Sequence, residues 1–327
     1  TITLKEALTK TYISDEDEVD VDLGVQISNG KWLRDTLGQL KNPSKIRNKA
    51  KPKYLKATLR PYQKNGYNWL NQMNDLGFGA CLADDMGLGK TVQVISFLEK
   101  MYETNKESHV LLIVPASLLG NWSKEIDKFA PRMTYHILHG KTNILDEDCF
   151  ATITTYGMAL RMECLQERVW DCLILDEAQA IKNPGTKQTR AIKKIPSQMR
   201  IAMTGTPIEN DLSNLWSLFD FLNKGLLGSA TDFKNYTKKV QAYPEYMSKL
   251  KMMVSPFILR RLKTDKSIIS DLPDKMEITE HVDLSKRQIV LYRKEVEKAE
   301  ELILESEGME RRGIILGLLT RLKQICN

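Results

Sequence analysis

The sequence predicts an α/β domain with a mostly parallel sheet that is covered by helices on both faces, followed by an α-helical appendage. Short runs of β-branched and aliphatic residues recur through the middle of the chain, and each run is apolar at successive positions. Such runs are typical of strands that are buried on both faces, whereas half-exposed strands alternate in polarity. Amphipathic stretches separate the runs, and this alternation is typical of parallel sheets with right-handed crossovers.

Six apolar runs are predicted as strands, and helices are predicted between them. The strand runs are residues 80–83, 110–114, 135–138, 150–154, 172–175 and 201–203. Apolar residues at helical spacing predict helices after Lys90, around Trp122 and over residues 212–222. Past residue 224 we expect no further strand.

The last third of the chain is predicted to be helical. Apolar spacing predicts helices near residues 233–240 and 246–253. Ser285 and Gln288 have the spacing of a capping box at the start of a long helix, which we expect Gly308 to separate from a second helix.

The length of 327 residues favours about two domains. We expect residues 1–54 to be the tail of an upstream region or a linker, residues 55–225 to be the α/β domain, and residues 226–327 to be the helical appendage. The chain does not start with Met, so we expect a fragment of a longer protein.

Composition and charge exclude several classes of protein. The hydrophobic fraction of 42% and the charged fraction of 28% are close to globular averages. No apolar run approaches the roughly 18 residues of a membrane-spanning helix, and the first residues do not resemble a secretory signal. The net charge of +6 permits a polyanionic partner without requiring one. Most of the basic excess near the start lies over residues 41–56.

The cysteines and histidines do not form a metal-binding pattern. The five cysteines are an odd number and no pair has the spacing of zinc ligands. We interpret them as free thiols in a reducing compartment and expect a cytoplasmic protein, at the nucleoid in a bacterium or in the nucleus of a eukaryote. His136 and His139 flank an apolar run, and a metal site there is disfavoured.

A glycine-rich segment provides the clearest chemical signal. Residues 84–91 read Asp-Asp-Met-Gly-Leu-Gly-Lys-Thr between a predicted strand and a predicted helix. This is the context of a phosphate-binding loop, in which backbone N–H groups and the helix N-terminus hold the phosphates. Lys90 is expected to reach the β- and γ-phosphates, and Thr91 is expected to ligate Mg²⁺. Asp84 departs from the strict pattern, which has Gly at this position.

Two further segments follow predicted strands. Asp176 and Glu177 come directly after residues 172–175, at the edge where ligands bind in open α/β sheets. Asp176 is expected to hold Mg²⁺ and Glu177 to act as general base toward water, although an acidic pair can also cap a helix. Residues 204–207, Thr-Gly-Thr-Pro, follow the last strand run and read as a turn that can also sense the γ-phosphate.

In this order the three segments resemble motifs I, II and III of superfamily-two helicase-like ATPases, and in detail those of the Swi/Snf family of double-stranded DNA translocases. Supporting segments cover the chain from about Leu59 to Asn327. Residues 59–63 with Gly66 resemble the adenine-reading Q motif, residues 114–125 motif Ia and residues 154–156 motif Ib. Residues 255–261 resemble the first helical protrusion of the family, and residues 322–327 the segment before its second lobe. Gln179, where many relatives have His, favours a bacterial member.

The resemblance implies a RecA-like lobe that uses ATP and Mg²⁺, and it implies roles for individual residues. The ATP-binding residues implied are Arg60, Gln63, Met86, Gly87, Leu88, Gly89, Lys90 and Thr91. Catalytic roles are implied for Lys90, Asp176 and Glu177, and Mg²⁺ ligation for Thr91 and Asp176. A role in coupling the nucleotide to motion is implied for Gln179, Thr204, Gly205 and Thr206. Candidate DNA contacts are Ser117, Leu118, Asn121, Thr155 and Lys182, although Ser and Asn at helix starts are also common caps. The aromatic residues Trp122, Tyr156 and Trp216 are interpreted as core residues and not as platforms for base stacking.

The resemblance also implies partners. Double-stranded DNA is the expected polymer, and an RNA duplex remains an alternative. A protein cargo on the DNA is a further candidate partner. Motifs IV to VI and the arginine finger belong to a second RecA-like lobe, which we do not find in this sequence. An arginine finger contributes roughly 10³-fold or more to the rate, so we expect the isolated chain to be weakly active or inactive. Arg260 and Arg261 are the first candidates for a substitute cation. Two alternatives remain: a nucleotide- or DNA-binding module without turnover, and another P-loop enzyme such as a kinase.

Overall fold

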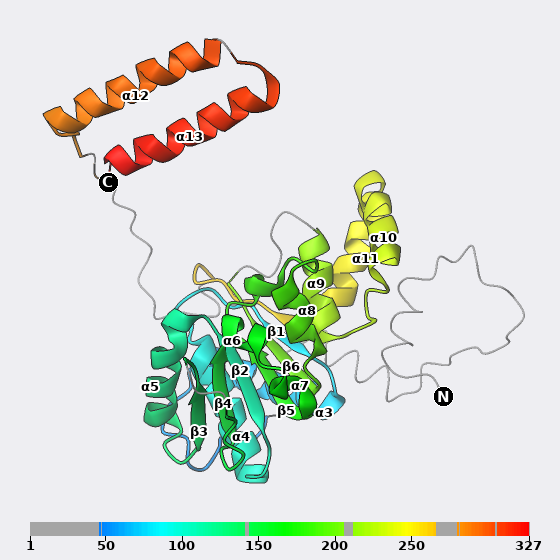
Figure 1. Cartoon of the computed structure of the whole chain (residues 1–327). Coiled ribbons are helices and arrows are strands. Elements are labelled where there is room, and N and C mark those ends of the chain that lie inside the picture. Colours follow the sequence, from blue (N-terminus) through cyan, green and yellow to red (C-terminus); the bar gives the residue numbers. More distant parts are fainter. Residues whose placement is uncertain are drawn as a thin grey trace, which may run out of the picture. The chain divides into compact units, whose positions relative to one another are not determined.

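The computed structural model describes residues 46, 48–140, 144–205, 212–265, 280, 282–304 and 306–326. The chain divides into two compact units, residues 1–272 and residues 273–327. The described part of the first unit is a sheet with helices, and that of the second is a helical hairpin (Figure 1). No described helix is long and apolar enough to span a membrane.

The sheet has seven strands among the described residues, and all its pairings are parallel. The strands in spatial order are β3 (Tyr135–Leu138), β4 (Ala151–Thr155), β2 (Val110–Val114), β5 (Trp170–Leu175), β6 (Ser197–Met203), β1 (Ala80–Leu82) and β7 (Ile258–Leu259). The first six lie where the apolar runs predict them. This sheet confirms the predicted α/β class.

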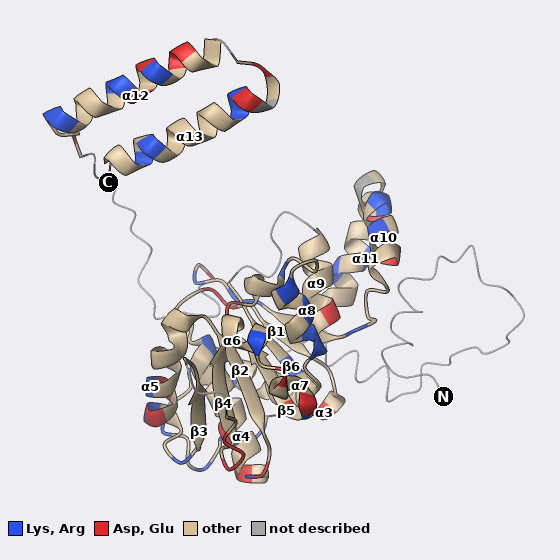
Figure 2. Cartoon of the chain, viewed as in Figure 1, with Lys and Arg blue, Asp and Glu red and all other residues tan. Residues whose placement is uncertain are grey.

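Both faces of the sheet are buried, because alternate side chains of a strand point to opposite faces. On β2, Val110, Leu112 and Val114 join one apolar cluster, while Leu111 and Ile113 join the other. The first cluster is covered by α3 (Pro61–Leu76), α4 (Lys90–Thr104) and α5 (Leu119–Phe129), and the second by α6 (Tyr156–Arg161), α7 (Cys164–Glu167) and α8 (Lys187–Lys194). The strands carry few charged residues (Figure 2). Helix α9 (Leu212–Leu222) contributes to both clusters.

Strand β7 is a correction to the sequence prediction, which expected no strand past residue 224 and ended the α/β domain at residue 225. The chain leaves the sheet through α10 (Ala230–Ala242) and α11 (Pro244–Val254), and then returns as β7 beside β1. The strand has two residues, so its local apolar pattern is too short to be recognised. Its pairing of Cys81 with Ile258 and Leu82 with Leu259 places the following residues beside the end of β1.

The second unit contains α12 (Lys286–Leu304) and α13 (Gly308–Cys326), as predicted. Ser285 and Gln288 form the expected capping box, since Gln288 N donates to Ser285 Oγ and Ser285 N donates to Gln288 Oε1. The Gln288 side chain also donates to the carbonyl of Ile325 at 2.8 Å, which joins the two helices.

Candidate active site

The three predicted motifs lie side by side at one edge of the sheet. The glycine-rich loop follows β1, the acidic pair follows β5, and Thr204 follows β6. Strands β5, β6 and β1 are neighbours and parallel, so their carboxyl ends meet at the same edge. Ligands of open α/β sheets bind at this edge. The topology therefore brings together segments that are far apart in the sequence.

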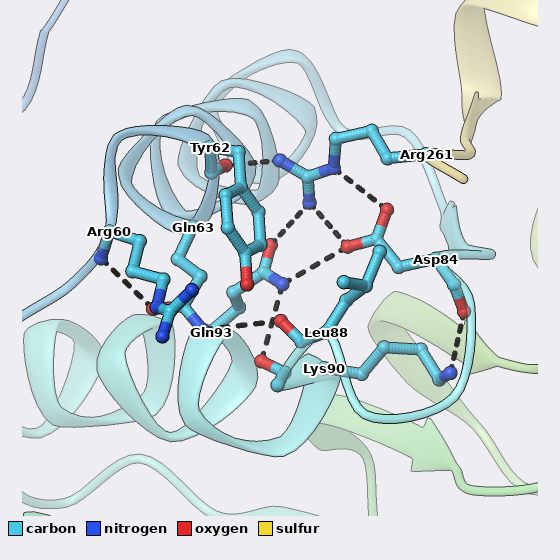
Figure 3. Close-up of polar contacts among 9 residues, drawn as sticks. Arg60, Tyr62, Gln63, Asp84, Leu88, Lys90, Gln93 and Arg261 are labelled. Carbon is cyan, nitrogen blue, oxygen red and sulfur yellow. Dashed lines mark hydrogen bonds and ion pairs between the residues drawn. The ribbon is translucent and has the colours of Figure 1, made fainter. Parts of the chain in front are cut away.

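The glycine-rich loop has the backbone of a phosphate site. Gly87 and Gly89 have φ angles of 84° and 75°, which residues with a side chain rarely adopt. Gly89 is the N-cap of α4, so the N-terminal N–H groups of this helix open into the loop. Lys90 Nζ donates to the carbonyl of Asp84 at 2.6 Å and lies within the loop (Figure 3). Thr91 is in the first turn of the same helix, and Met86 at the tip is 76% exposed.

Asp84, the residue that departs from the strict motif, is fully buried and paired with Arg261. Arg261 Nε donates to Asp84 Oδ1 at 2.8 Å, and Arg261 Nη2 pairs with the other carboxylate oxygen. Gln93 Nε2 also donates to that oxygen, at 3.1 Å (Figure 3). A buried carboxylate is costly unless it is paired and hydrogen-bonded. This pair was not predicted from the sequence, although an Asp at a Gly position in a buried loop is itself a signal that a cation lies nearby.

Gln63 joins helix α3 to the loop. Its side-chain oxygen accepts from the backbone N–H of Arg60 at 3.0 Å, and its Nε2 donates to the carbonyl of Leu88 at 3.2 Å (Figure 3). The φ angle of 75° disfavours any other residue at Gly89, and a Cβ there would also lie 2.5 Å from Gln63 Nε2. Both ends of the Gln63 amide are bonded within the protein, so reading adenine requires it to exchange these bonds for bonds to the base.

The acidic pair is held by donors on both carboxylate oxygens of Asp176. Trp122 Nε1 donates to Oδ2 at 2.8 Å, and the backbone N–H of Glu177 donates to Oδ1 at 3.0 Å. Burial raises the pKa of Asp176, while the Trp122 hydrogen bond opposes the rise. Tyr156 also supports this turn, since its hydroxyl donates to the carbonyl of Asp176 at 2.7 Å. Trp122 and Tyr156 were interpreted as core residues, and these two bonds were not predicted from the sequence.

A relay of side chains joins the acidic pair to the end of β6. Thr204 Oγ1 donates to Gln179 Oε1 at 3.1 Å, and Gln179 Nε2 donates to Glu177 Oε2 at 2.7 Å. The structure thus brings together Glu177, Gln179 and Thr204, as a coupling role requires. Gly205 follows in the turn, and Thr206 lies outside the described residues. Glu177 has a φ angle of 52°, which makes it the one described residue other than Gly with a positive φ, and such strain is typical of functional sites.

The candidate DNA contacts divide into two groups. Ser117 and Asn121 are exposed at the start of α5, Leu118 is half-buried between them, and Lys182 is exposed after the acidic pair. Thr155 requires a correction, because it is 6% exposed and its Oγ1 accepts from Met158 N as the N-cap of α6. Its side chain is therefore committed to capping.

The residues at this edge fit a nucleotide with Mg²⁺. No described group of three or more His, Cys, Asp or Glu side chains is arranged to hold a metal, but Mg²⁺ at nucleotides is typically held by one or two carboxylates together with phosphate oxygens and water. Asp176 is a buried carboxylate whose raised pKa a cation would offset. Thr91 and Asp176 are the residues that would hold the ion, and Lys90 and the loop N–H groups would hold the phosphates.

Comparisons with known proteins point to one family. The model of the SNF2-related domain family matches residues 62–327. A relative at 40% identity over 96% of this chain is YwqA of Bacillus subtilis, whose name describes an ATP-dependent helicase/translocase. The ISWI chromatin-remodeling complex ATPase ISW1 of Saccharomyces cerevisiae is 32% identical over 84% of this chain.

A solved structure has the same architecture. It is the Sulfolobus solfataricus SWI2/SNF2 ATPase core in complex with dsDNA, with a TM-score of 0.66 and 46% identity. The match covers 84% of this chain and 60% of that one. This chain spans 36% of the length of YwqA and 26% of ISW1.

Proposed function

This chain belongs to the SNF2-related domain family, and on that premise we propose that its sheet edge binds and hydrolyses ATP as one lobe of a translocase that moves along double-stranded DNA. The observation that carries the proposal is the meeting of three elements at neighbouring strand ends. These are a phosphate loop with Lys90, an acidic pair with Glu177, and a side-chain relay from Glu177 through Gln179 to Thr204.

The chemistry follows from the position of each group. Lys90 and the N-terminus of α4 offset the negative charge of the phosphates. Mg²⁺, when bound, neutralises charge that develops on the phosphate oxygens. Glu177 accepts a proton from the attacking water, and Gln179 orients this carboxylate by donating to its Oε2 at 2.7 Å. The backbone N–H of Glu177 and the Trp122 indole fix the orientation of Asp176.

The proposed DNA contacts lie on the exposed start of α5. Ser117 and Asn121 are exposed there, and Lys182 is exposed on the segment after the acidic pair. The backbone N–H of Leu118 donates to the carbonyl of Pro115 at 2.9 Å, and Asn121 Nδ2 donates to Glu125 Oε1 at 3.2 Å, so each would exchange this bond for a contact to phosphate. Backbone contacts of this type fix the position of a duplex without reading its sequence. The related Sulfolobus solfataricus ATPase core was solved with dsDNA, which supports the choice of duplex. A binding module without turnover is the second candidate, because the chain spans only part of its relatives.

Steady-state ATP hydrolysis by the chain, with a second lobe supplied in trans, tests the proposal. We expect turnover to rise with duplex DNA and to be lost in Lys90→Ala, because the loop then lacks its phosphate-binding cation. Lys100→Ala is the matched control, since Lys100 lies toward the other end of the same helix. Undiminished turnover in Lys90→Ala would refute the proposed site. ATP binding without turnover under every condition would favour the binding module.

A further inference from the structure

The segment that follows β7 runs along the start of the phosphate loop and is bonded to it repeatedly. Ala83 N donates to the carbonyl of Leu259 at 2.7 Å, and Asp85 N donates to the carbonyl of Arg261 at 3.0 Å. Lys263 N then donates to Asp85 Oδ2 at 2.9 Å. The pairing of β1 with β7 thus continues past both strands, and residues 83–85 are held by residues 259–263.

Arg261 makes the deepest of these contacts and joins three elements. Its guanidinium bonds the Asp84 carboxylate, the Gln93 Oε1 of α4 at 2.7 Å, and the Tyr62 carbonyl of α3 (Figure 3). Arg261 is 6% exposed, and Asp84 and Gln93 are fully buried. A Cβ on Gly66 would lie 1.8 Å from Gln93 Oε1, so a side chain at this position would displace the Gln93 amide from its present contacts.

Asp84 links this cluster to the phosphate-binding lysine. Its carboxylate bonds Arg261, and its backbone carbonyl accepts from Lys90 Nζ at 2.6 Å. Lys90 is therefore close to the residue whose carboxylate Arg261 neutralises. Without the guanidinium, Asp84 would be a buried anion in the same loop as the Lys90 ammonium group, and a buried unpaired charge strongly attracts a counter-charge.

We propose that Arg261 is a positioning residue for ATP binding: by pairing with Asp84, it keeps that carboxylate from capturing Lys90 and so leaves the lysine available to the phosphates. The inference rests on the proposed function, since it assigns to Lys90 the role of phosphate ligand. It predicts that loss of Arg261 weakens binding of phosphate-bearing ligands and that removal of the Asp84 charge restores it.

The test measures binding of ATP, ADP and adenosine by calorimetry, at a temperature where circular dichroism shows every variant folded. Arg261→Gln is expected to weaken ATP and ADP binding by about tenfold or more, a typical loss when an orienting partner is removed, and to change adenosine binding little. The double variant Asp84→Asn with Arg261→Gln has no charge at either position and is expected to bind ATP within about threefold of wild type.

Arg200→Gln is the control for loss of an arginine that is half-buried and bonded to backbone carbonyls. Arg200 lies on β6 and donates to the carbonyls of Phe221 and Ile195, each at 2.9 Å. Its loss is expected to lower the melting temperature without changing nucleotide affinity. If Arg261→Gln is not folded in buffer, all proteins are measured in trimethylamine N-oxide, which favours folded states.

Three results would distinguish failure of the inference about Arg261 from failure of the proposed function. Unchanged ATP affinity in Arg261→Gln would overturn the inference. A loss that Asp84→Asn does not restore would also overturn it, because the defect would then not arise from the Asp84 charge. If Lys90→Ala binds ATP as tightly as wild type, the phosphate site and the proposed function are wrong, whatever Arg261→Gln does.

Discussion

Two buried carboxylates near the same edge of the sheet have opposite surroundings. Asp84, after β1, is fully buried and bonded to a guanidinium and an amide. Asp176, after β5, is 6% exposed and is bonded to an indole and a backbone N–H. The structure describes an ion pair at Asp84, and it describes none at Asp176.

These environments distinguish a carboxylate that stabilises the loop from one that can bind a cation. The charge of Asp84 is already neutralised, so this residue holds the loop together. Donors orient Asp176 without neutralising it, and burial raises its pKa, so a divalent cation would stabilise it. A third buried carboxylate, Glu99 on α4, is away from the edge, and neither of its oxygens has a hydrogen-bond partner among the described residues.

The largest expected effect is the loss of turnover when the proton acceptor of the acidic pair is replaced without a change in side-chain size. Glu177→Gln removes the proton acceptor but keeps a side chain of the same size, so ATP binding should be retained while turnover falls by about 10²-fold or more. Single-turnover hydrolysis and equilibrium binding, measured on the same preparation with the second lobe in trans, check both parts. Turnover near the wild-type rate would mean that another group accepts the proton.

The raised pKa of Glu99, the third carboxylate, predicts that the stability of the protein depends on pH. Burial raises the pKa of Glu99 from 4.5 to about 7, and the neighbouring Glu103 adds to the rise while Arg132 opposes it. The folded state therefore binds the Glu99 proton more tightly than the unfolded state does. The stability that this proton contributes is lost as pH rises from about 4.5 to about 7. Glu99→Gln should raise the free energy of unfolding at pH 8 by about 2 kcal/mol.

Denaturant unfolding at pH 5 and pH 8 measures this effect. The gain in Glu99→Gln should be present at pH 8 and largely absent at pH 5, because Glu99 of the wild type is then protonated in the folded state. The control Glu107→Gln changes an exposed glutamate just past the same helix and should behave as wild type at both values. An equal gain at both pH values would contradict the assignment to Glu99.

The smallest expected effect concerns the donor to Asp176. Trp122→Phe keeps an aromatic ring in the core but removes the indole N–H that bonds Oδ2 at 2.8 Å. The Mg²⁺ concentration for half-maximal turnover should rise about tenfold, as is typical when a partner of a metal ligand is lost. Trp216→Phe, which removes an indole bond to the carbonyl of Gly228, is the control. An unchanged Mg²⁺ requirement in Trp122→Phe would show that Trp122 does not position Asp176.

The sequence predicted what is local and missed what depends on distant contacts. Asp176 and Glu177 were found because they directly follow a buried strand, and Lys90 was found because a glycine-rich loop connects a buried strand to it. The topology then places these strand ends at one edge of the sheet. Strand β7 was missed because a strand of two residues has no recognisable pattern in the sequence. It is a strand only through its pairing with β1. The Arg261 contact to Asp84 spans 177 residues, a separation over which a single sequence gives no signal.

Some residue types also serve two roles that the sequence does not distinguish. Thr155 was predicted to contact DNA, but a threonine at the start of a helix is as suitable for a cap, and the structure gives it that role. Trp122 was interpreted as core and is buried, yet its indole N–H has a specific partner at the site. Gln63 was assigned to adenine, and its amide is bonded to the loop and to Arg60.

The comparison of the two carboxylates is tested most directly by the Mg²⁺ dependence of ATP binding in Asp84→Asn and Asp176→Asn. We expect Asp176→Asn to remove the Mg²⁺ dependence with little loss of thermal stability. Asp84→Asn should keep the Mg²⁺ dependence but lose about 3 kcal/mol of stability, because it leaves the buried Arg261 unpaired. The reverse pattern, with Mg²⁺ dependence lost in Asp84→Asn and retained in Asp176→Asn, would contradict the account.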